Sequence, residues 1–185
     1  GGRALENLSA QKKFVCVMDF SLQEVANEMK GSIVTSGADR MENAGKMGIP
    51  LMIAPGAIDL IDTPTWKALP EDFKNRGYHA HNRLIASVTM TAEERRQMAR
   101  LIGEKLQKAT GKTAFFLPSQ GIEEWDRKGN PLHDAEGHAA FCDEIKTALP
   151  DSTHFVELDA HINDKAFANA VLELFDKWIE VGIIK

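Results

Sequence analysis

The feature of this sequence that most limits its fold is the regular alternation of short apolar runs with longer segments of helical periodicity. The apolar runs predict strands at 13–18, 50–54, 78–81, 113–117 and 154–158, with a weak one at 32–35. Helical patterns fill 3–9, 22–30, 39–47, 91–109, 134–149 and 164–181. Because parallel strands need long crossover connections, this alternation predicts an α/β fold of three layers, doubly wound around a mainly parallel sheet and Rossmann-like.

The segment from 91 to 109 carries the clearest helical signal. Met98, Leu101 and Ile102 share one face, and Thr91 with Glu94 forms the sequence pattern of a capping box. Three basic residues of the same segment are expected on its solvent side, close to glutamates: Arg95, Arg96 and Arg100.

Composition restricts the class of protein. A chain of 185 residues with 43% hydrophobic content fits one globular domain, residues 1–185, and a net charge of −5 argues against nucleic acid as a partner. No apolar stretch approaches the roughly 18 residues of a membrane span. Cys16 and Cys142 are far apart and are expected to be reduced core residues. These features favour a cytoplasmic protein without a membrane partner.

Polar and glycine residues follow most of the predicted strands. If those strands are parallel, their carboxyl ends share the edge of the sheet where open α/β folds bind ligands. We therefore expect a small-ligand site made from the following residues: Ser36, Gly37, Asp39, Arg40, Gly56, His81, Asn82, Ser119, Gln120, Gly121, Asp159, His161 and Asn163.

The segment Ser36-Gly37-Ala38-Asp39 supports two interpretations. It is either a helix cap preceded by a turn glycine or an anion cradle in which Arg40 supplies a counter-charge. Neither the G-x-G-x-x-G fingerprint nor the phosphate-loop pattern occurs in the chain. The sequence therefore argues against a classical Rossmann dehydrogenase and a phosphate-loop ATPase.

Histidines supply a weaker indication of a metal site. His79 and His81 would point to the same face of a regular strand, which suits metal ligation. Further ligands for zinc or another divalent ion are His133, His161 and Asp159, although no H-E-x-x-H pattern is present. In the alternative interpretation, His79 is partly exposed and only His81 is structured. A metal-dependent hydrolase that uses His81, His133 and His161 is therefore one functional hypothesis.

The segment from Asp159 to Asp164 lies between a predicted strand and a predicted helix. Asp159 and His161 flank one alanine, an arrangement that suits a carboxylate orienting an imidazole base or ligand. Asn163 is expected to cap the helix predicted at 164–181, and Asp134 is expected to cap the helix predicted at 134–149. Ser119-Gln120-Gly121 lacks the G-x-S-x-G elbow, so we expect a binding loop there rather than a nucleophile.

Several motifs, taken together, resemble the Tm-1-like family, named for a plant protein that confers resistance to a tobamovirus. The matching stretches cover nearly the whole chain in order: 2–6, 36–45, 48–50, 56–59, 81–82, 129–134 and 157–164. The resemblance implies that the chain is the second, C-terminal α/β subdomain of a two-subdomain protein. It also implies binding of ATP with Mg²⁺ near the cleft between the subdomains, contact with the N-terminal subdomain, and a homo-oligomer, since the plant member binds ATP and forms homodimers.

The leading hypothesis is therefore a domain that binds a small molecule or nucleotide at the carboxyl edge of the sheet. The main alternative is a non-enzymatic module for dimerisation or protein interaction, in which the apolar and irregular segment Ile58 to Trp66 would provide the partner surface. The sequence alone does not decide whether the domain is part of an enzyme.

Overall fold

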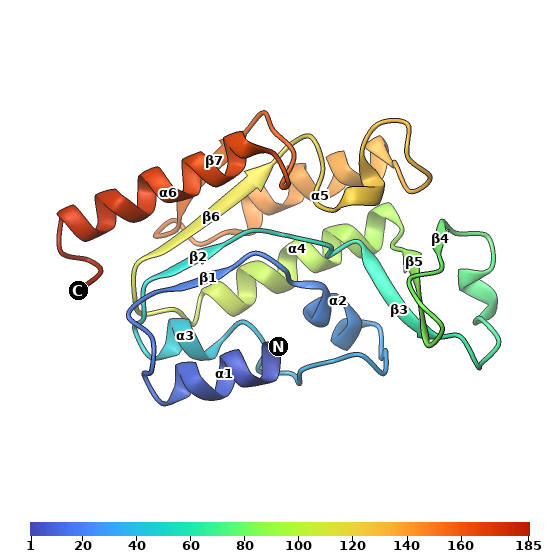
Figure 1. Ribbon diagram of the computed structural model, residues 1–185, viewed down its shortest axis with the longest axis horizontal. Coiled ribbons are helices and arrows are strands. Elements are labelled where there is room, and N and C mark those ends of the chain that lie inside the picture. The colour runs from blue at the N-terminus through green and yellow to red at the C-terminus, as the bar shows by residue number, and fades with distance from the viewer.

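A computed structural model describes all 185 residues and contains a central parallel sheet (Figure 1). Its four strands are β1 (Val17–Asp19), β2 (Leu51–Ile53), β6 (Thr113–Pro118) and β7 (His154–Leu158), in the order β1-β2-β6-β7. Every neighbouring pair is parallel, with Leu51 opposite Thr113 and Ala114 opposite His154 in the register. All four carboxyl ends therefore lie on one edge of this sheet, as expected.

Helices cover both faces of the sheet. The α-helices are α1 (Gly2–Ala10), α2 (Gln23–Met29), α3 (Asn43–Lys46), α4 (Ala92–Leu106), α5 (Ala135–Ala148) and α6 (Lys165–Glu180), and two short 3-10 helices span Glu71–Phe73 (η1) and Glu124–Asp126 (η2). Figure 1 shows α6 on one side of the sheet and α4 on the other. The three-layer α/β architecture predicted from the sequence is confirmed.

Side chains of the buried strands alternate between two hydrophobic cores. Phe115 and Leu117 of β6 point into the larger core, which also contains residues of α2, α4 and α5. Ala114 and Phe116 point into the smaller core, where Phe167 and Trp178 of α6 pack. This alternation explains why the two central strands, β2 and β6, lack a polar face, since both of their faces are covered.

A second, antiparallel sheet lies beside the parallel one (Figure 1). It consists of β3 (Leu60–Pro64), β5 (Ile85–Thr89) and β4 (Tyr78–His79), in the order β3-β5-β4. Neither β3 nor β5 was predicted. The strand expected at 78–81 exists only as β4, and its antiparallel pairing with β5 removes His81 and Asn82 from the carboxyl edge of the parallel sheet.

The segment Ile58 to Trp66 is mostly β3 rather than an irregular surface segment. Ile58, Leu60 and Ile61 are buried, and only Trp66 of the apolar residues there is exposed, at 62%. The expectation that this segment is a partner surface is therefore wrong. Its apolar character is explained by the larger core, in which Ile58 and Ile61 pack.

The weak strand expected at 32–35 is absent. The Ser32 hydroxyl donates to the Asp62 carbonyl at 2.6 Å and accepts from the Val34 amide, so local side-chain bonds replace a strand ladder. Other boundaries also shift: the strand expected from residue 13 begins at Val17, and the helix expected from 39 to 47 covers only Asn43–Lys46. The capping box at the start of α4 is confirmed, with Thr91 and Glu94 bonded in both directions.

Candidate functional site

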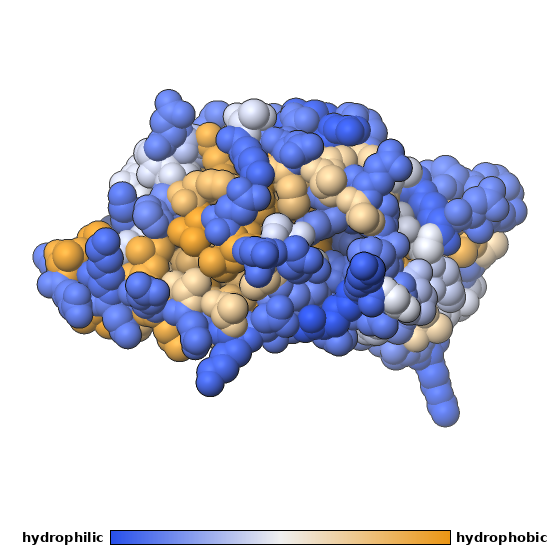
Figure 2. Space-filling model, turned by 90° about the horizontal axis from the view of Figure 1, so that it is seen from above, coloured by the Kyte–Doolittle hydropathy of each residue, from blue (hydrophilic) through white to orange (hydrophobic).

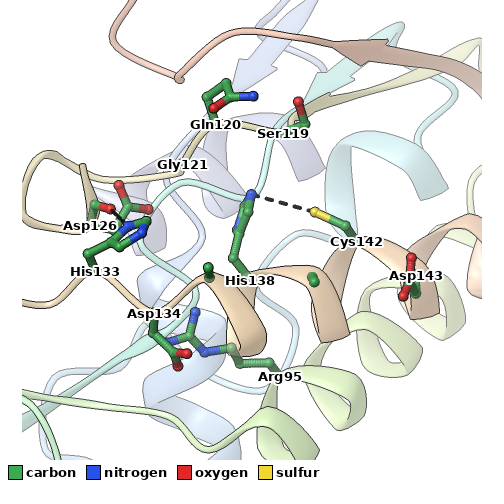
Figure 3. A pocket seen from close by; sticks show the side chains of 12 residues that line it. Arg95, Ser119, Gln120, Gly121, Asp126, His133, Asp134, His138, Cys142 and Asp143 are labelled. Carbon is green, nitrogen blue, oxygen red and sulfur yellow. Dashed lines mark hydrogen bonds and ion pairs between the residues drawn. The ribbon is translucent and has the colours of Figure 1, made fainter. Parts of the chain in front are cut away.

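The candidate site is a cavity at the carboxyl end of β6, between the loop Ser119–Gly121 and the first turns of α5 (Figure 3). Its volume is about 290 Å³. Most of its twelve lining residues are polar or glycine: Arg95, Ser119, Gln120, Gly121, Asp126, His133, Asp134, Ala135, His138, Ala139, Cys142 and Asp143. Three of the residues expected from the sequence, Ser119 to Gly121, therefore line one cavity.

Gly121 makes the close packing of this loop possible. Its φ of +132° lies in a region that L side chains rarely adopt, and a Cβ there would lie 2.4 Å from Asp126 Oδ1 and 2.5 Å from His161 Cδ2. The loop is also tied to the end of β7, because the Gln120 amide side chain donates to Asp159 at 2.6 Å and its backbone N–H donates to the Ala160 carbonyl. The ends of β6 and β7 thus form one continuous rim.

His161 is a buried structural partner in this rim, with 1% exposure. Its Nε2 lies 2.8 Å from the Glu123 carbonyl and 3.0 Å from Asp126 Oδ1, and its Nδ1 accepts a hydrogen bond from the Asn163 amide. The partner of His161 is therefore Asp126. The pairing with Asp159 that the sequence suggested is wrong, since Asp159 is exposed and bonds Gln120.

One of the two expected helix caps is present, at α5, and the other, at α6, is not. Asp134 caps α5 as expected, because its side chain accepts from the Gly137 amide. Asn163 does not cap α6: Asp164 occupies that position, and the Asn163 side chain donates to Glu124 instead. The interpretation of Asn163 as a helix cap was therefore wrong.

His138 and Cys142 face the cavity from successive turns of α5 (Figure 3). The two side chains contact one another, with 3.5 Å between Nε2 and Sγ, and the buried Nδ1 of His138 has no hydrogen-bond partner. Burial lowers the pKa of His138 and raises that of the Cys142 thiol to about 11. The imidazole is thus a neutral polar group, and the thiol is a poor nucleophile at neutral pH.

Arg95 lies beneath the cavity and is 2% exposed. Its guanidinium pairs with Asp59 at 3.3 Å and with Asp134 at 3.0 Å. The sequence-based expectation that Arg95 faces solvent is wrong, whereas Arg96 and Arg100, which pair with Glu93, are more than 40% exposed. Of the three arginines on α4, Arg95 therefore places its guanidinium in the core beside the cavity.

Three carboxylates lie together below this cavity, and we call Asp59, Glu123 and Asp126 the buried carboxylate cluster. One oxygen from each lies within 4.8 Å of the others. Burial raises the pKa of Asp59 to about 6 and that of Glu123 to about 8. The sequence reasoning missed this cluster because Asp59 lies in the β2–β3 connection, far along the chain from the other two, and because Glu123 and Asp126 match only the short capping-box pattern of η2.

The remaining predicted site residues lie elsewhere. Arg40 is 3% exposed and pairs with Glu24, Asp19 and Glu6, so its charge is already balanced by three carboxylates rather than held free for an anion. Ser36 donates to Glu24, Arg3 pairs with Asp39, and Gly37 has a φ of +94° in a turn. Because α3 starts only at Asn43, the segment Ser36–Asp39 does not cap it directly.

Gly56 belongs to the turn after β2, where a Cβ would lie 2.0 Å from the Phe20 carbonyl oxygen. His81 and Asn82 are exposed beyond β4, and His79 stacks on Trp125 with 3.8 Å between ring centroids. The structure does not bring His81, His133 and His161 into one ligand-sized group; the group it forms contains only the carboxylate cluster.

These features define a three-layer α/β domain with a polar cavity at the carboxyl edge of its sheet. The chain belongs to the uncharacterised protein family UPF0261, whose C-terminal domain matches residues 1–179. It is 54% identical over its whole length to a UPF0261 protein of Brucella melitensis and 35% identical, over 92% of the chain, to one of Clostridium tetani. The matches cover 44% and 43% of those relatives, so the chain spans less than half of their length.

The resemblance to the Tm-1-like family is also confirmed. The chain is 30% identical to the tomato ToMV resistance protein Tm-1(GCR237) over 177 residues, which is 95% of the chain and 24% of that protein. No helix of the structure combines the length and apolar character that crossing a membrane requires.

Proposed function

We propose that this domain binds a small polar ligand, of the nucleotide class, in the cavity between Ser119–Gly121 and α5. The observation that supports it is the position of the cavity at the carboxyl end of a parallel strand, where open α/β folds hold ligands. The Ser119 hydroxyl, which makes no hydrogen bond within the protein, and the polar side chains opposite it on α5 suit polar ligand atoms.

Charge indicates the form in which a nucleotide would bind. The lining contains three carboxylates, from Asp126, Asp134 and Asp143, but only one guanidinium, from Arg95. A bare triphosphate would be repelled by this excess of negative charge, whereas its magnesium complex carries less charge. We therefore expect ATP to bind only together with Mg²⁺.

Thermal unfolding with increasing ATP, in the presence and absence of Mg²⁺, tests this proposal. Ligand at 100 times its dissociation constant should stabilise the protein by about 2.7 kcal/mol. Ala139→Trp would fill the cavity from the exposed side of α5 and abolish the effect, while Ala168→Trp, an equally exposed position on α6, is the matched control. No stabilisation by any nucleotide, or equal stabilisation of both variants, contradicts the proposal.

A role in self-association has a separate observation in its favour. Leu172, Ile179 and Val181 on and just after α6 are 53%, 48% and 61% exposed. Figure 2, which views the molecule from above Figure 1, shows an apolar area on this side. Light scattering after size exclusion tests it: a dimer that dissociates in Leu172→Glu supports the role, and a strictly monomeric protein rejects it.

A further inference from the structure

The buried carboxylate cluster beneath the cavity contains oxygens that accept no hydrogen bond from the protein. Asp59 is completely buried, and neither of its side-chain oxygens accepts a hydrogen bond. Oε1 of Glu123, a residue that is 6% exposed, also lacks a partner. Because an unsatisfied buried polar group costs about 1–3 kcal/mol, three such oxygens in one place require an explanation.

The other oxygens of the cluster are held in place by the backbone. Glu123 Oε2 accepts from the Trp125 amide at 2.6 Å, and Asp126 Oδ2 accepts from the amides of Ile122 and Glu123. These bonds lock two of the three carboxylates onto η2. Asp59 is fixed independently by the backbone, since its carbonyl accepts from Met90 at 2.7 Å. The cluster is therefore positioned before anything binds to it.

Few basic groups face this cluster. Arg95 is the only cation in contact with the cluster, at 3.3 Å from Asp59, and it also pairs with Asp134. His161 contributes a ring nitrogen at 3.0 Å from Asp126 Oδ1 and simultaneously contacts a carbonyl. Three buried carboxyl groups therefore share one guanidinium, which also pairs with a fourth carboxylate.

The cluster around Arg40 shows that this chain can satisfy two buried carboxylates and a partly buried third without a ligand. There, all six oxygens of Glu6, Asp19 and Glu24 accept hydrogen bonds, from the guanidinium, from backbone amides or from Ser36. The two clusters have the same number of acids and one central arginine each, but only the one beneath the cavity has unsatisfied oxygens.

We propose that Asp59, Glu123 and Asp126 bind one divalent cation of the hard, oxygen-preferring class, such as Mn²⁺, Mg²⁺ or Ca²⁺. The mutual distances of their oxygens, all within 4.8 Å, are compatible with the roughly 3–5 Å that separates ligand atoms around such an ion. An all-carboxylate donor set favours these ions over Zn²⁺ or Cu²⁺. Asp126 also lines the cavity, which supplies the route by which the ion and its waters enter.

The experiment uses metal alone, so that its result is independent of the proposed nucleotide. Protein purified without a histidine tag is treated with chelator and titrated with Mn²⁺, Mg²⁺ and Ca²⁺ by calorimetry, and Mn²⁺ is followed by electron paramagnetic resonance. We expect one saturable site. Asp59→Asn and Glu123→Gln should each weaken affinity by about tenfold or more, since loss of even an outer partner costs this much. Glu104→Gln, which removes an exposed carboxylate on α4 outside the cavity, should leave affinity almost unchanged.

Circular dichroism and thermal unfolding without metal establish that each variant is folded. Two separate ligand variants are used so that the test still works if one of them does not fold. A wild-type protein that does not bind Mn²⁺, Mg²⁺ or Ca²⁺ at millimolar concentration overturns the proposal, as does undiminished binding by a folded Asp59→Asn or Glu123→Gln. If metal binds but ATP does not, the cation site stands and the nucleotide proposal fails. If ATP binds but the metal ions alone do not, the nucleotide proposal stands and the cation site is rejected.

Discussion

Replacement of His161 by alanine is the most direct test of the rim that joins β6 and β7. In the neutral ring, Nδ1 accepts from Asn163, so the proton lies on Nε2 and is shared between the Glu123 carbonyl and Asp126. The substitution removes these three contacts and leaves their partners in a site that is 1% exposed. It also removes a ring that contacts Gly121.

The expected cost follows from these contacts. Each unsatisfied buried group costs about 1–3 kcal/mol, and entry of water recovers part of this, so we expect a loss of about 3–5 kcal/mol in the free energy of unfolding. Urea denaturation measures it as a lower midpoint at constant slope. His161→Gln, which keeps a donor near the position of Nε2, should lose less than His161→Ala.

His154→Ala provides the matched control, because His154 is exposed on β7 and should change stability by no more than about 0.5 kcal/mol. If His161→Ala costs less than about 1 kcal/mol with an unchanged slope, His161 is not a structural partner. A free, ligand-binding imidazole at this position would then be the better description, and the assignment of Asp126 as its partner would be refuted.

Three further substitutions test other parts of the structure by denaturation. Gly121→Ala should cost about 2–5 kcal/mol, because it adds backbone strain to a steric clash; a loss below about 1 kcal/mol contradicts the φ of +132°. Arg40→Met should cost about 3–5 kcal/mol by leaving buried carboxylates uncompensated, and a neutral result would mean that the arginine is free for a ligand. Glu94→Gln should cost roughly 1–3 kcal/mol at neutral pH, because contacts with Arg76 and Lys30 outweigh burial and lower the pKa of Glu94 to about 2. Because the pKa of Glu94 is lower in the folded protein, its ionised side chain stabilises the folded state at pH values above its ordinary pKa near 4.5. The difference in stability between wild type and Glu94→Gln should therefore shrink as pH falls from about 4.5 toward 2. A difference that grows as pH falls contradicts this reasoning.

The sequence predicted those elements whose causes are local. Helix α4 begins with a capping box and has an apolar stripe within one segment, and β6 is an uninterrupted apolar run, so both were found nearly at their observed bounds. Strand β3 was missed because its ordering depends on distant partners: the Asp62 side chain accepts from Gln23, Asn27 and Ser87. Nothing within a Pro- and Asp-containing segment indicates such contacts.

The candidate site shows the same limit more strongly. Its loop, Ser119 to Gly121, was predicted because strand ends are visible in sequence. The charges that matter beneath it were not, because Arg95 meets Asp59 and His161 meets Asp126 only after the chain folds. We expected Arg95 to face solvent because of its neighbours within α4, and we expected Asp159 to pair with His161 because they are close in sequence. Both expectations are wrong because the actual partners, Asp59 and Asp126, lie more than 30 residues away in the chain.

This difference explains why the carboxylate cluster is informative. Local patterns specify which segments become strands and helices, and the core would be equally well specified with apolar side chains in place of Asp59 and Glu123. Buried carboxyl groups at these positions make the native state less stable unless their oxygens are satisfied. Around Arg40 the compensation is visible in six hydrogen-bonded oxygens, whereas beneath the cavity it is incomplete. The unsatisfied oxygens of the buried carboxylate cluster lower the stability of the folded protein beside the carboxyl edge of the sheet. This destabilisation is the physical reason to look for the ligand of the domain there.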